Sequence, residues 1–367
     1  MSSKERVKRT WQRQMTDRVP INYFANPGID HRLKEYFGLQ PDDDEGLRIA
    51  LGIDFRCIAP SYKGPRLHPE IPHRQVNPIW GWVTRWVEHG AGGYWDYCDF
   101  PLAGADAAAL AAWPLPDPDD FAYEEVTKAC RRWEDYAIVA GNPGLGDIIN
   151  SNGFLFGTEE ALVRLAADDE YFLRFVDRRL DIQLEITRRT LEAGDGNIDL
   201  LWIGEDLGTQ RGPLISHELF CRHILPRHQR FIDLAKRFGV PAMLHSCGSS
   251  SWAFPDFIKI GLSAVDTLQP DAVNMSPLYL KRNFGDKLIF HGCISTAGVL
   301  AFGGVAETVE HCRHTLEIMM PGGGYCFAPT HCLQDNTPTA NAVAMYETAH
   351  RLGHWRPPQA SDLFANS

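Results

Sequence analysis

Hydrophobic runs that recur along the chain predict a series of buried strands. Eight runs of apolar, β-branched or aromatic residues stand between longer segments that have helical spacing. They lie at 19–25, 54–60, 136–142, 198–206, 241–247, 264–270, 288–294 and 324–331. Residues 159–194 carry the longest helical pattern between two of these runs. Buried strands that alternate with helices are typical of parallel sheets, so we predict an α/β fold of the (β/α)8 TIM-barrel class.

One segment, at about 61–125, interrupts the alternation of strands and helices. It is rich in Pro, Gly and Trp, and "WGWVTRWVEHGAGGYWDYCDF" at 80–100 has the pattern of a small hairpin. We expect a Trp-rich insertion after the second strand that forms a lid or pocket wall, within a single domain over residues 1–367. Trp95 is a candidate for contact with an aromatic substrate, although Trp is also an ordinary packing residue in such hairpins.

Composition narrows the class of protein. Hydrophobic residues make up 44% of the 367 residues and charged residues 23%, which is typical of a globular protein. A net charge of −11 without a stripe of Lys or Arg argues against nucleic acid as a partner. No apolar run approaches the roughly 20 residues that span a membrane. The nine dispersed cysteines do not form a disulfide framework, so we expect a reducing, cytoplasmic location.

The first residues of the chain are basic and lack the apolar core of a signal peptide. The stretch "MSSKERVKRTWQRQ" follows a possible Ser cap and predicts a short solvated helix.

Polar side chains gather at the ends of the predicted strands. They are Asn142, Glu205, Asp206, His245, Cys247, Gln269, His291, Cys293, His331 and Cys332. Catalytic residues of (β/α)8 barrels lie at the carboxyl ends of the strands, so these residues are predicted to surround one site.

His245 and Cys247 form the sharpest chemical signal in the chain. Residues i and i+2 of a strand point to the same side, so this pair directs an imidazole and a thiolate into one volume. Zinc accepts both donor types, and a catalytic zinc ion commonly has three protein ligands and one open position. The alternative is a buried thiol beside a hydrogen-bonded histidine.

The segments around this pair resemble a known family. "HSCGSSSWAFPDFIKIGLSAVDTLQP", "LKRNFGDKLIFHGCIS" and "PGGGYCFAPTHCLQDNTPTANAVAMYE", together with "DRVPINYF" and "GEDLGTQRGPLIS", resemble the uroporphyrinogen decarboxylase superfamily. The resemblance is strongest over 198–348 and points to the zinc-dependent corrinoid methyltransferase branches, which include O-demethylase components. It implies a (β/α)8 barrel.

The resemblance also implies a third zinc ligand on the last strand. His331 occupies the matching position, Cys332 follows it, and Cys326 lies inside the strand rather than at its exit. We prefer His331 and keep both cysteines as alternatives. Gln269 and Asn142 are expected to form the substrate pocket wall.

Two activities fit the resemblance. The decarboxylase branch holds its tetrapyrrole with arginines after the first strand, but "NYFANPGIDHR" has no Arg between Ile21 and His31. We therefore expect demethylation of a small methylated substrate, in particular a methoxylated aromatic compound, with zinc as Lewis acid and Glu205 or Asp206 as proton donor. No DxHxxG motif is present, so the resemblance implies that a separate corrinoid protein, or free cobalamin, accepts the methyl group. A homodimer is a further expectation.

Overall fold

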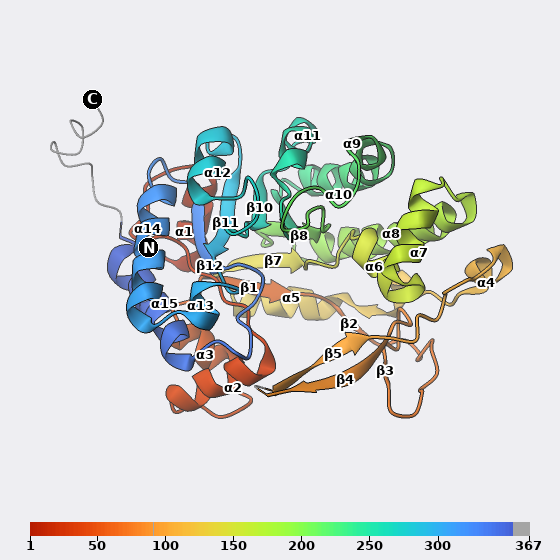
Figure 1. The fold of residues 1–367 in the computed structure, drawn as a ribbon, viewed down its shortest axis with the longest axis horizontal. Helices are drawn as coiled ribbons and strands as arrows, with labels where there is room; N and C mark the ends of the chain where they lie inside the picture. The colour runs from red at the N-terminus through yellow and green to blue at the C-terminus, as the bar shows by residue number, and fades with distance from the viewer. Residues whose placement is uncertain (91, 355–367) are drawn as a thin grey trace.

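A curled sheet of parallel strands forms the centre of the protein (Figure 1). The computed structural model describes residues 1–90 and 92–354. Its seven strands are, in spatial order, β1 (Phe55–Ile58), β7 (Ala137–Gly141), β8 (Leu200–Gly204), β9 (Ala242–Ser246), β10 (Ala264–Thr267), β11 (Ile289–Ile294) and β12 (Tyr325–Pro329). Every neighbouring pair is parallel, and each strand falls within a predicted hydrophobic run. The α/β class is therefore confirmed.

The first predicted strand, residues 19–25, is not one of these seven strands. Ile21 makes an isolated parallel bridge to Phe327 of β12, and its carbonyl accepts a hydrogen bond of 2.9 Å from the backbone N–H of Asp54. The segment thus lies between β12 and the residue that precedes β1. Pro20 has no N–H to donate, which limits the pairing. The eight-stranded barrel stays a prediction.

Helices cover the outer face of the sheet (Figure 1). The helices before β8 are α1 (Ser3–Trp11), α2 (Pro27–Tyr36), α3 (Asp44–Ala50), α4 (Ala107–Ala112), η1 (Pro118–Asp120), α5 (Tyr123–Arg132), α6 (Ile149–Phe156), α7 (Thr158–Ala166) and α8 (Glu170–Ala193). After β8 come α9 (His217–Leu219), η2 (Phe220–Ile224), α10 (Leu225–Arg237), η3 (Ser251–Ala253), α11 (Phe254–Ile260), α12 (Pro277–Phe284), α13 (Val299–Phe302), α14 (Val305–Met319) and α15 (Thr339–Leu352).

The long helix expected over 159–194 is two helices, α7 and α8. Asp169 ends the break between them, and its side chain accepts hydrogen bonds from the backbone N–H groups of Tyr171 and Phe172. A carboxylate in this position satisfies donors that the first turn leaves unpaired, so it starts a new helix.

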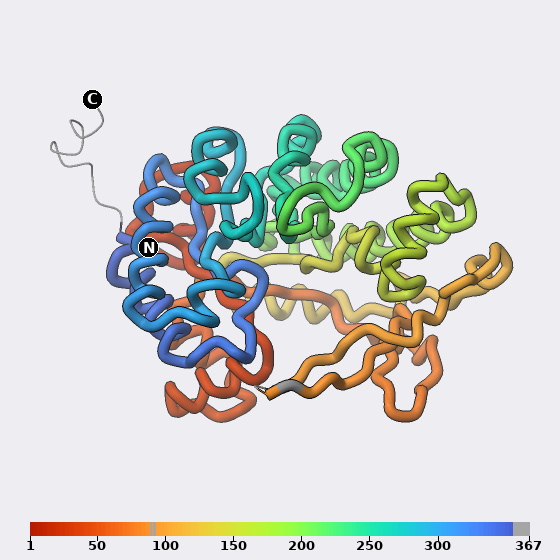
Figure 2. Tube along the Cα trace, in the orientation of Figure 1, coloured from red at the N-terminus to blue at the C-terminus, as the bar shows by residue number. Residues whose placement is uncertain are grey.

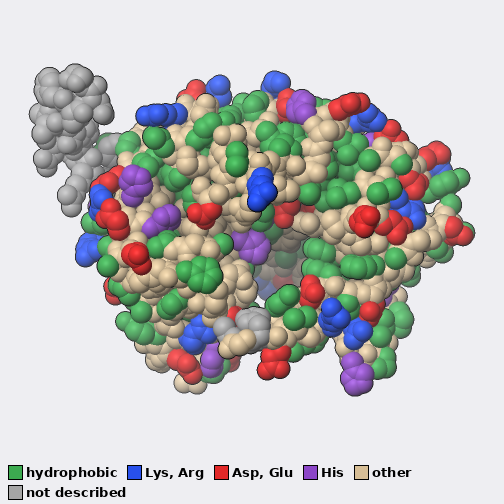
Figure 3. Space-filling model, viewed as in Figure 1, with side chains coloured by type: hydrophobic (Ala, Val, Ile, Leu, Met, Phe, Trp, Pro, Cys, Tyr) green, Lys and Arg blue, Asp and Glu red, His purple; other side chains and the backbone are tan. Residues whose placement is uncertain are grey.

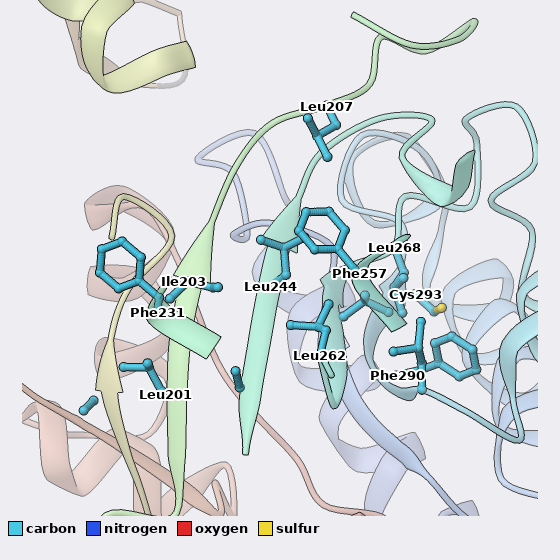
Figure 4. Close-up of a cluster of buried hydrophobic side chains, with 14 of the residues drawn as sticks. Leu201, Ile203, Leu207, Phe231, Leu244, Phe257, Leu262, Leu268, Phe290 and Cys293 are labelled. Carbon is cyan, nitrogen blue, oxygen red and sulfur yellow. The ribbon is translucent and has the colours of Figure 1, made fainter. Parts of the chain in front are cut away.

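The sheet divides the apolar core into two layers. In β8, Leu200 and Trp202 pack on the inner side with residues of the other strands, while Leu201 and Ile203 belong to the larger cluster beneath the helices. Figure 4 shows that outer cluster, with Leu201 and Ile203 near Phe231 and with Leu244 near Phe257. This alternation is the period of two that a strand imposes on its side chains.

Helix α1 corrects the expectation of a solvated helix. Ser2 caps it as predicted, since its side chain accepts a hydrogen bond from the N–H of Glu5. Its Val7, however, is buried and packs in the inner layer of the sheet. The basic residues misled the prediction because Arg6, although charged, is buried against the carboxylates of Asp17 and Asp54.

The insertion forms small antiparallel sheets outside the main sheet. β3 (Gln75–Val76), β4 (Val83–His89) and β5 (Gly92–Tyr97) make one sheet, and β2 (Ser61–Tyr62) pairs with β6 (Phe121–Ala122). Figure 2 shows β4 and β5 as a long arm. Residue 91 of the expected hairpin and residues 355–367 of the expected single domain lie outside the described residues.

Two further features concern the cysteines and the helices. All nine cysteines are free thiols. Within residues 1–90 and 92–354, none of the helices combines the length and the apolarity that crossing a membrane requires.

Candidate metal centre and substrate cavity

His245, Cys247 and His331 come together at the carboxyl ends of β9 and β12. Cys247 follows β9, and its Sγ lies 3.5 Å from Nε2 of His245. The rings of His245 and His331 are 5.8 Å apart. Each of the three residues offers one ligand atom, and these atoms all lie within 4.8 Å of one another. The structure thus groups the three residues that we expected as metal ligands, and their metal role stays a prediction. We call this group the trio.

Asp266 of β10 holds the first histidine of the trio. It is the cross-strand neighbour of both His245 in β9 and His291 in β11. Its Oδ2 lies 2.7 Å from Nδ1 of His245, and its Oδ1 lies 2.6 Å from Nδ1 of His291. Burial acts to raise the pKa of the Asp266 carboxyl, but the two imidazoles outweigh burial and hold that pKa well below its usual range. Nδ1 of His245 is thereby occupied, and Nε2 is left for the trio.

Sequence reasoning missed Asp266 and selected Gln269 in the same run. In the structure, Oε1 of Gln269 accepts a hydrogen bond of 2.7 Å from the backbone N–H of Gly248, so it fixes the loop after Cys247. An acidic residue within the apolar stretch "AVDTLQP" was the available signal. A buried carboxylate requires partners, and the register between strands supplies them.

Three residues, one of them a member of the trio, have unusual backbone conformations. Thr267, Cys293 and His331 have φ angles of 80°, 73° and 59°, which place them in the left-handed region. They lie at the carboxyl ends of β10, β11 and β12. Such conformations cost of order 1–3 kcal/mol each and cluster at functional sites. At Thr267 this turn brings the hydroxyl within 2.8 Å of Nδ1 of His245.

The two alternatives for the third ligand have other partners. Cys326 is fully buried in the inner apolar layer. Sγ of Cys332 lies 3.1 Å from Nδ1 of His331 and donates a hydrogen bond to Oδ1 of Asn26. Among the described residues, the group that could hold a metal ion here is His245, Cys247 and His331. It contains neither Cys326 nor Cys332.

The two expected proton donors follow β8 and have different partners. Both carboxylate oxygens of Glu205 accept hydrogen bonds of 2.9 Å from the backbone N–H groups of Ile148 and Ile149 at the start of α6. The side chain is 1% exposed, and burial raises its pKa to about 8. Oδ1 of Asp206 accepts a hydrogen bond of 2.8 Å from the N–H of Cys247. Oδ2 of Asp206 also accepts a hydrogen bond of 2.8 Å from Nδ2 of Asn150 in α6. Asp206 therefore lies between the trio and α6, whereas both oxygens of Glu205 are directed to the start of α6.

The donor set of the trio fits zinc. Two imidazole nitrogens and one thiolate sulfur suit a borderline-soft cation, and three ligands leave one tetrahedral position open. Hydrogen bonding of Nδ1 to a carboxylate is the usual way in which a ligating histidine is oriented. Burial raises the pKa of the Cys247 thiol, so its thiolate form needs a cation beside it.

A cavity of about 380 Å³ lies between the ends of β1 and β7, helix α8 and the insertion. Its aromatic lining residues are Trp80, Trp82, Tyr97, Phe121 and Phe154, and its polar ones include Asn142, Asp147, Ser151, Arg179 and Gln183. We call it the aromatic cavity. The face drawn in Figure 3 is hollowed. Asn142 thus lies where a pocket wall was expected. Trp95 does not line this cavity; it is half exposed and packs against Trp86.

Asp147 and Arg179 were not anticipated from the sequence. Arg179 lies on α8 between the buried residues Phe175, Val176 and Leu180, and an arginine on the apolar stripe of a helix was the signal. Asp147 hydrogen bonds with Glu205, which adjoins Asp206 beside the trio. This contact links the wall of the aromatic cavity to the trio.

A second, wider cavity of about 620 Å³ borders the trio. His331 and Cys332 line it together with Asn26, Thr296 and Phe302. We call it the outer cavity. The trio therefore has open space beside His331.

Comparisons with known proteins give a similar fold at a TM-score above 0.5 and a protein family. A methyltransferase from Methanosarcina mazei has a similar fold, with a TM-score of 0.63 over 96% of this chain and 99% of that chain, at 16% sequence identity. A 3-keto-D-glucoside 4-epimerase from E. coli aligns over 63% of this chain and 86% of its own, with 12% identity and a TM-score of 0.39. No curated protein sequence matches the chain.

A protein-family comparison matches residues 152–352, more than half of the chain, to the description uroporphyrinogen decarboxylase (URO-D). The match includes β8 to β12 and therefore all three members of the trio. The chain belongs to the uroporphyrinogen decarboxylase (URO-D) family.

Proposed function

We propose that this protein is a zinc-dependent methyltransferase that demethylates a small methoxylated aromatic compound and passes the methyl group to a corrinoid. The corrinoid is free cobalamin or is held by a separate protein. We further propose a (β/α)8 barrel in which residues 19–25 take the place of the remaining strand. The free cysteines support a reducing compartment.

One observation carries the proposal: the trio is grouped within 4.8 Å, and Asp266 leaves Nε2 of His245 free for a metal. A decarboxylase of the family needs no metal, so that activity would leave the trio without a role. The Methanosarcina mazei protein with the similar fold is a methyltransferase, which supports the same choice.

In this proposal the residues have the following roles. Asp266 orients His245, and Asp206 holds the backbone of Cys247 through its N–H. Zinc, when bound, supplies Lewis acidity that stabilises charge on the leaving oxygen. In the reaction the C–O bond of the ether breaks, the methyl group goes to the cob(I)alamin nucleophile, and the oxygen keeps the electron pair and takes a proton. Asp206, on the side of the trio, is the residue we assign to deliver that proton.

Metal analysis of the purified protein tests the centre. We expect one zinc per chain in the wild type, and loss of zinc in Cys247→Ala and His331→Ala. Cys326→Ala and Cys332→Ala are the matched controls and should keep the metal. Full zinc occupancy in Cys247→Ala would contradict the proposal.

A screen of methyl donors against cob(I)alamin tests the reaction, because methylation of the cobalt changes the absorbance spectrum. Donors with aryl methyl ethers should be active, and removal of zinc should abolish transfer. Turnover of uroporphyrinogen by metal-free protein would favour the decarboxylase alternative instead.

A further inference from the structure

Arg179 is a buried cation that has no ion-pair partner in the described part of the chain. Its side chain is 3% exposed. Nη1 donates to Oδ1 of Asn152 at 2.8 Å and to the carbonyl of Ser151 at 3.2 Å, but these acceptors are neutral. Nε has no hydrogen-bond partner. A buried guanidinium without a counter-charge is costly unless something else supplies the charge.

Asp147, an acidic residue that lines the same cavity, does not balance this charge. Oxygens of Asp147 accept hydrogen bonds from the N–H groups of Asn150 and Ser151, and burial raises the pKa of Asp147 well above its usual value. Burial lowers the pKa of the Arg179 guanidinium to about 10 and outweighs the opposing effect of Asp147, so this carboxyl does not balance the buried guanidinium.

Aromatic side chains form a large part of the cavity wall near Arg179. Trp80, Trp82, Tyr97 and Phe154 line the same cavity. The guanidinium carbon lies 5.7 Å from the centre of the Trp80 ring, and the rings of Trp82 and Phe154 are 6.4 Å apart. A volume of about 380 Å³ has room for one small molecule. Aromatic walls favour an aromatic ligand, and a lone guanidinium favours a carboxylate because two N–H groups match its two oxygens.

We propose that the aromatic cavity binds a small aromatic carboxylate, with its carboxylate paired to Arg179 and its ring between the tryptophans. The identification of this ligand as the methyl donor rests on the proposed function; the binding site itself does not. A cationic ligand would meet the charge of Arg179, so cations are excluded from this site.

Calorimetric titration of the wild-type protein tests the site with three probes that share one ring. They are 4-methoxybenzoate, its neutral isostere 4-methoxybenzamide, and (4-methoxyphenyl)trimethylammonium. We expect the carboxylate to bind at least about tenfold more tightly than the amide, since hydrogen bonds to charged groups are the stronger ones. Equal affinity for carboxylate and amide, or tightest binding of the cation, would overturn the proposal without need of any variant.

Variants of Arg179 and Arg178 then show which residue causes the preference for the carboxylate probe over the amide probe. Arg179→Met should bind carboxylate and amide with similar affinity, and Arg179→Lys should keep part of the preference because it keeps the charge. Arg178→Met is the matched control: Arg178 is exposed, and its Nη1 donates to the carbonyls of Leu110 and Ala111. It should behave as the wild type. A folded Arg179→Met protein that retains the full preference would assign it to another residue and overturn the proposal.

The readouts separate this inference from the proposed function. Carboxylate-selective binding without methyl transfer to cob(I)alamin would sustain the site and reject the function. Transfer from uncharged aryl ethers, with no selectivity for the carboxylate, would sustain the function and reject the site.

Discussion

The side chain of Asp266 orients a residue of the candidate metal centre. It contacts two histidines from neighbouring strands, and only one of them, His245, belongs to the trio. The other, His291, is fully buried, and its Nε2 lies 3.0 Å from Nδ2 of Asn22. The orientation of His245 is thus fixed by a chain of hydrogen bonds inside the sheet, not by the loop that carries Cys247.

Replacement of Asp266 by Asn should therefore weaken metal binding. We expect zinc affinity to fall about 10- to 100-fold, as is typical when a carboxylate behind a ligating histidine is lost. Competition with a chelator measures this affinity. Asp286→Asn, at an exposed position, is the control and should bind zinc as the wild type does. Unchanged affinity in Asp266→Asn would show that His245 is not a ligand.

Glu205 affects the stability of the protein because its carboxyl is buried. Its pKa is about 8 in the folded protein against an ordinary value of 4.5, because burial penalises the charged form. The folded protein therefore binds more protons at this residue than the unfolded chain does. The stability that Glu205 contributes is full below about pH 4.5 and is lost as the pH rises through about 8.

The direction of this pKa shift leads to a prediction for the pH dependence of stability. Between pH 6.5 and 8 the free energy of unfolding should fall in the wild type, with a slope of at most about 1.4 kcal/mol per pH unit from this group. Glu205→Gln, which cannot ionise, should show a smaller slope in denaturant titrations, and the exposed control Glu159→Gln should keep the slope of the wild type. The same slope in Glu205→Gln would mean that the group is ionised in the folded state.

Among the elements, α1 and the segment 19–25 are tied to β1 through one carboxylate. Asp54 precedes β1, is fully buried, and accepts hydrogen bonds from Nη1 of Arg6 and Nη1 of Arg18, both at 2.6 Å. It also accepts the backbone N–H of Ile21. These contacts lie at the amino end of β1, whereas the trio lies at the carboxyl ends of β9 and β12.

Asp54→Asn should consequently affect folding and spare the metal centre. It leaves Arg6 and Arg18 underpaired, so we expect a loss of about 3–5 kcal/mol of stability in denaturant titrations. Zinc content per folded chain should not change. Asp17→Asn removes a more exposed partner of Arg6 and should cost less than about 1 kcal/mol. Loss of zinc in Asp54→Asn would show that the two ends of the sheet are coupled.

For the whole molecule, the trio joins two strands that are not neighbours. His245 and Cys247 come from β9, and His331 follows β12, with β10 and β11 between them. A metal there would bind the folded protein and not the unfolded chain. It would therefore stabilise the folded arrangement of β9 to β12.

Zinc at 100 times its Kd should raise the free energy of unfolding by about 2.7 kcal/mol, and thus Tm by about 3–4 °C for a chain of this size. Thermal unfolding of metal-free protein with and without added zinc measures the shift. His331→Ala should show little shift, while Cys332→Ala should respond as the wild type. An equal shift in His331→Ala would remove His331 from the ligand set.

The sequence by itself determined the seven strands and the pairing of His245 with Cys247. Both depend on local periods, because alternation along a strand decides which side chains share a face. It also indicated the segment that adds the small antiparallel sheets, since Gly, Pro and Trp there break the helical spacing.

Only the tertiary structure decided which distant residues meet. The pairing of Asp266 with His245 depends on register between strands, and the burial of Arg6 and Arg179 depends on the surfaces that pack against α1 and α8. The direction of Glu205 toward α6, the exposure of Trp95 and the irregular pairing of residues 19–25 are of the same kind. Each is set by contacts between segments far apart in the chain, and the period of a single segment carries no information about them.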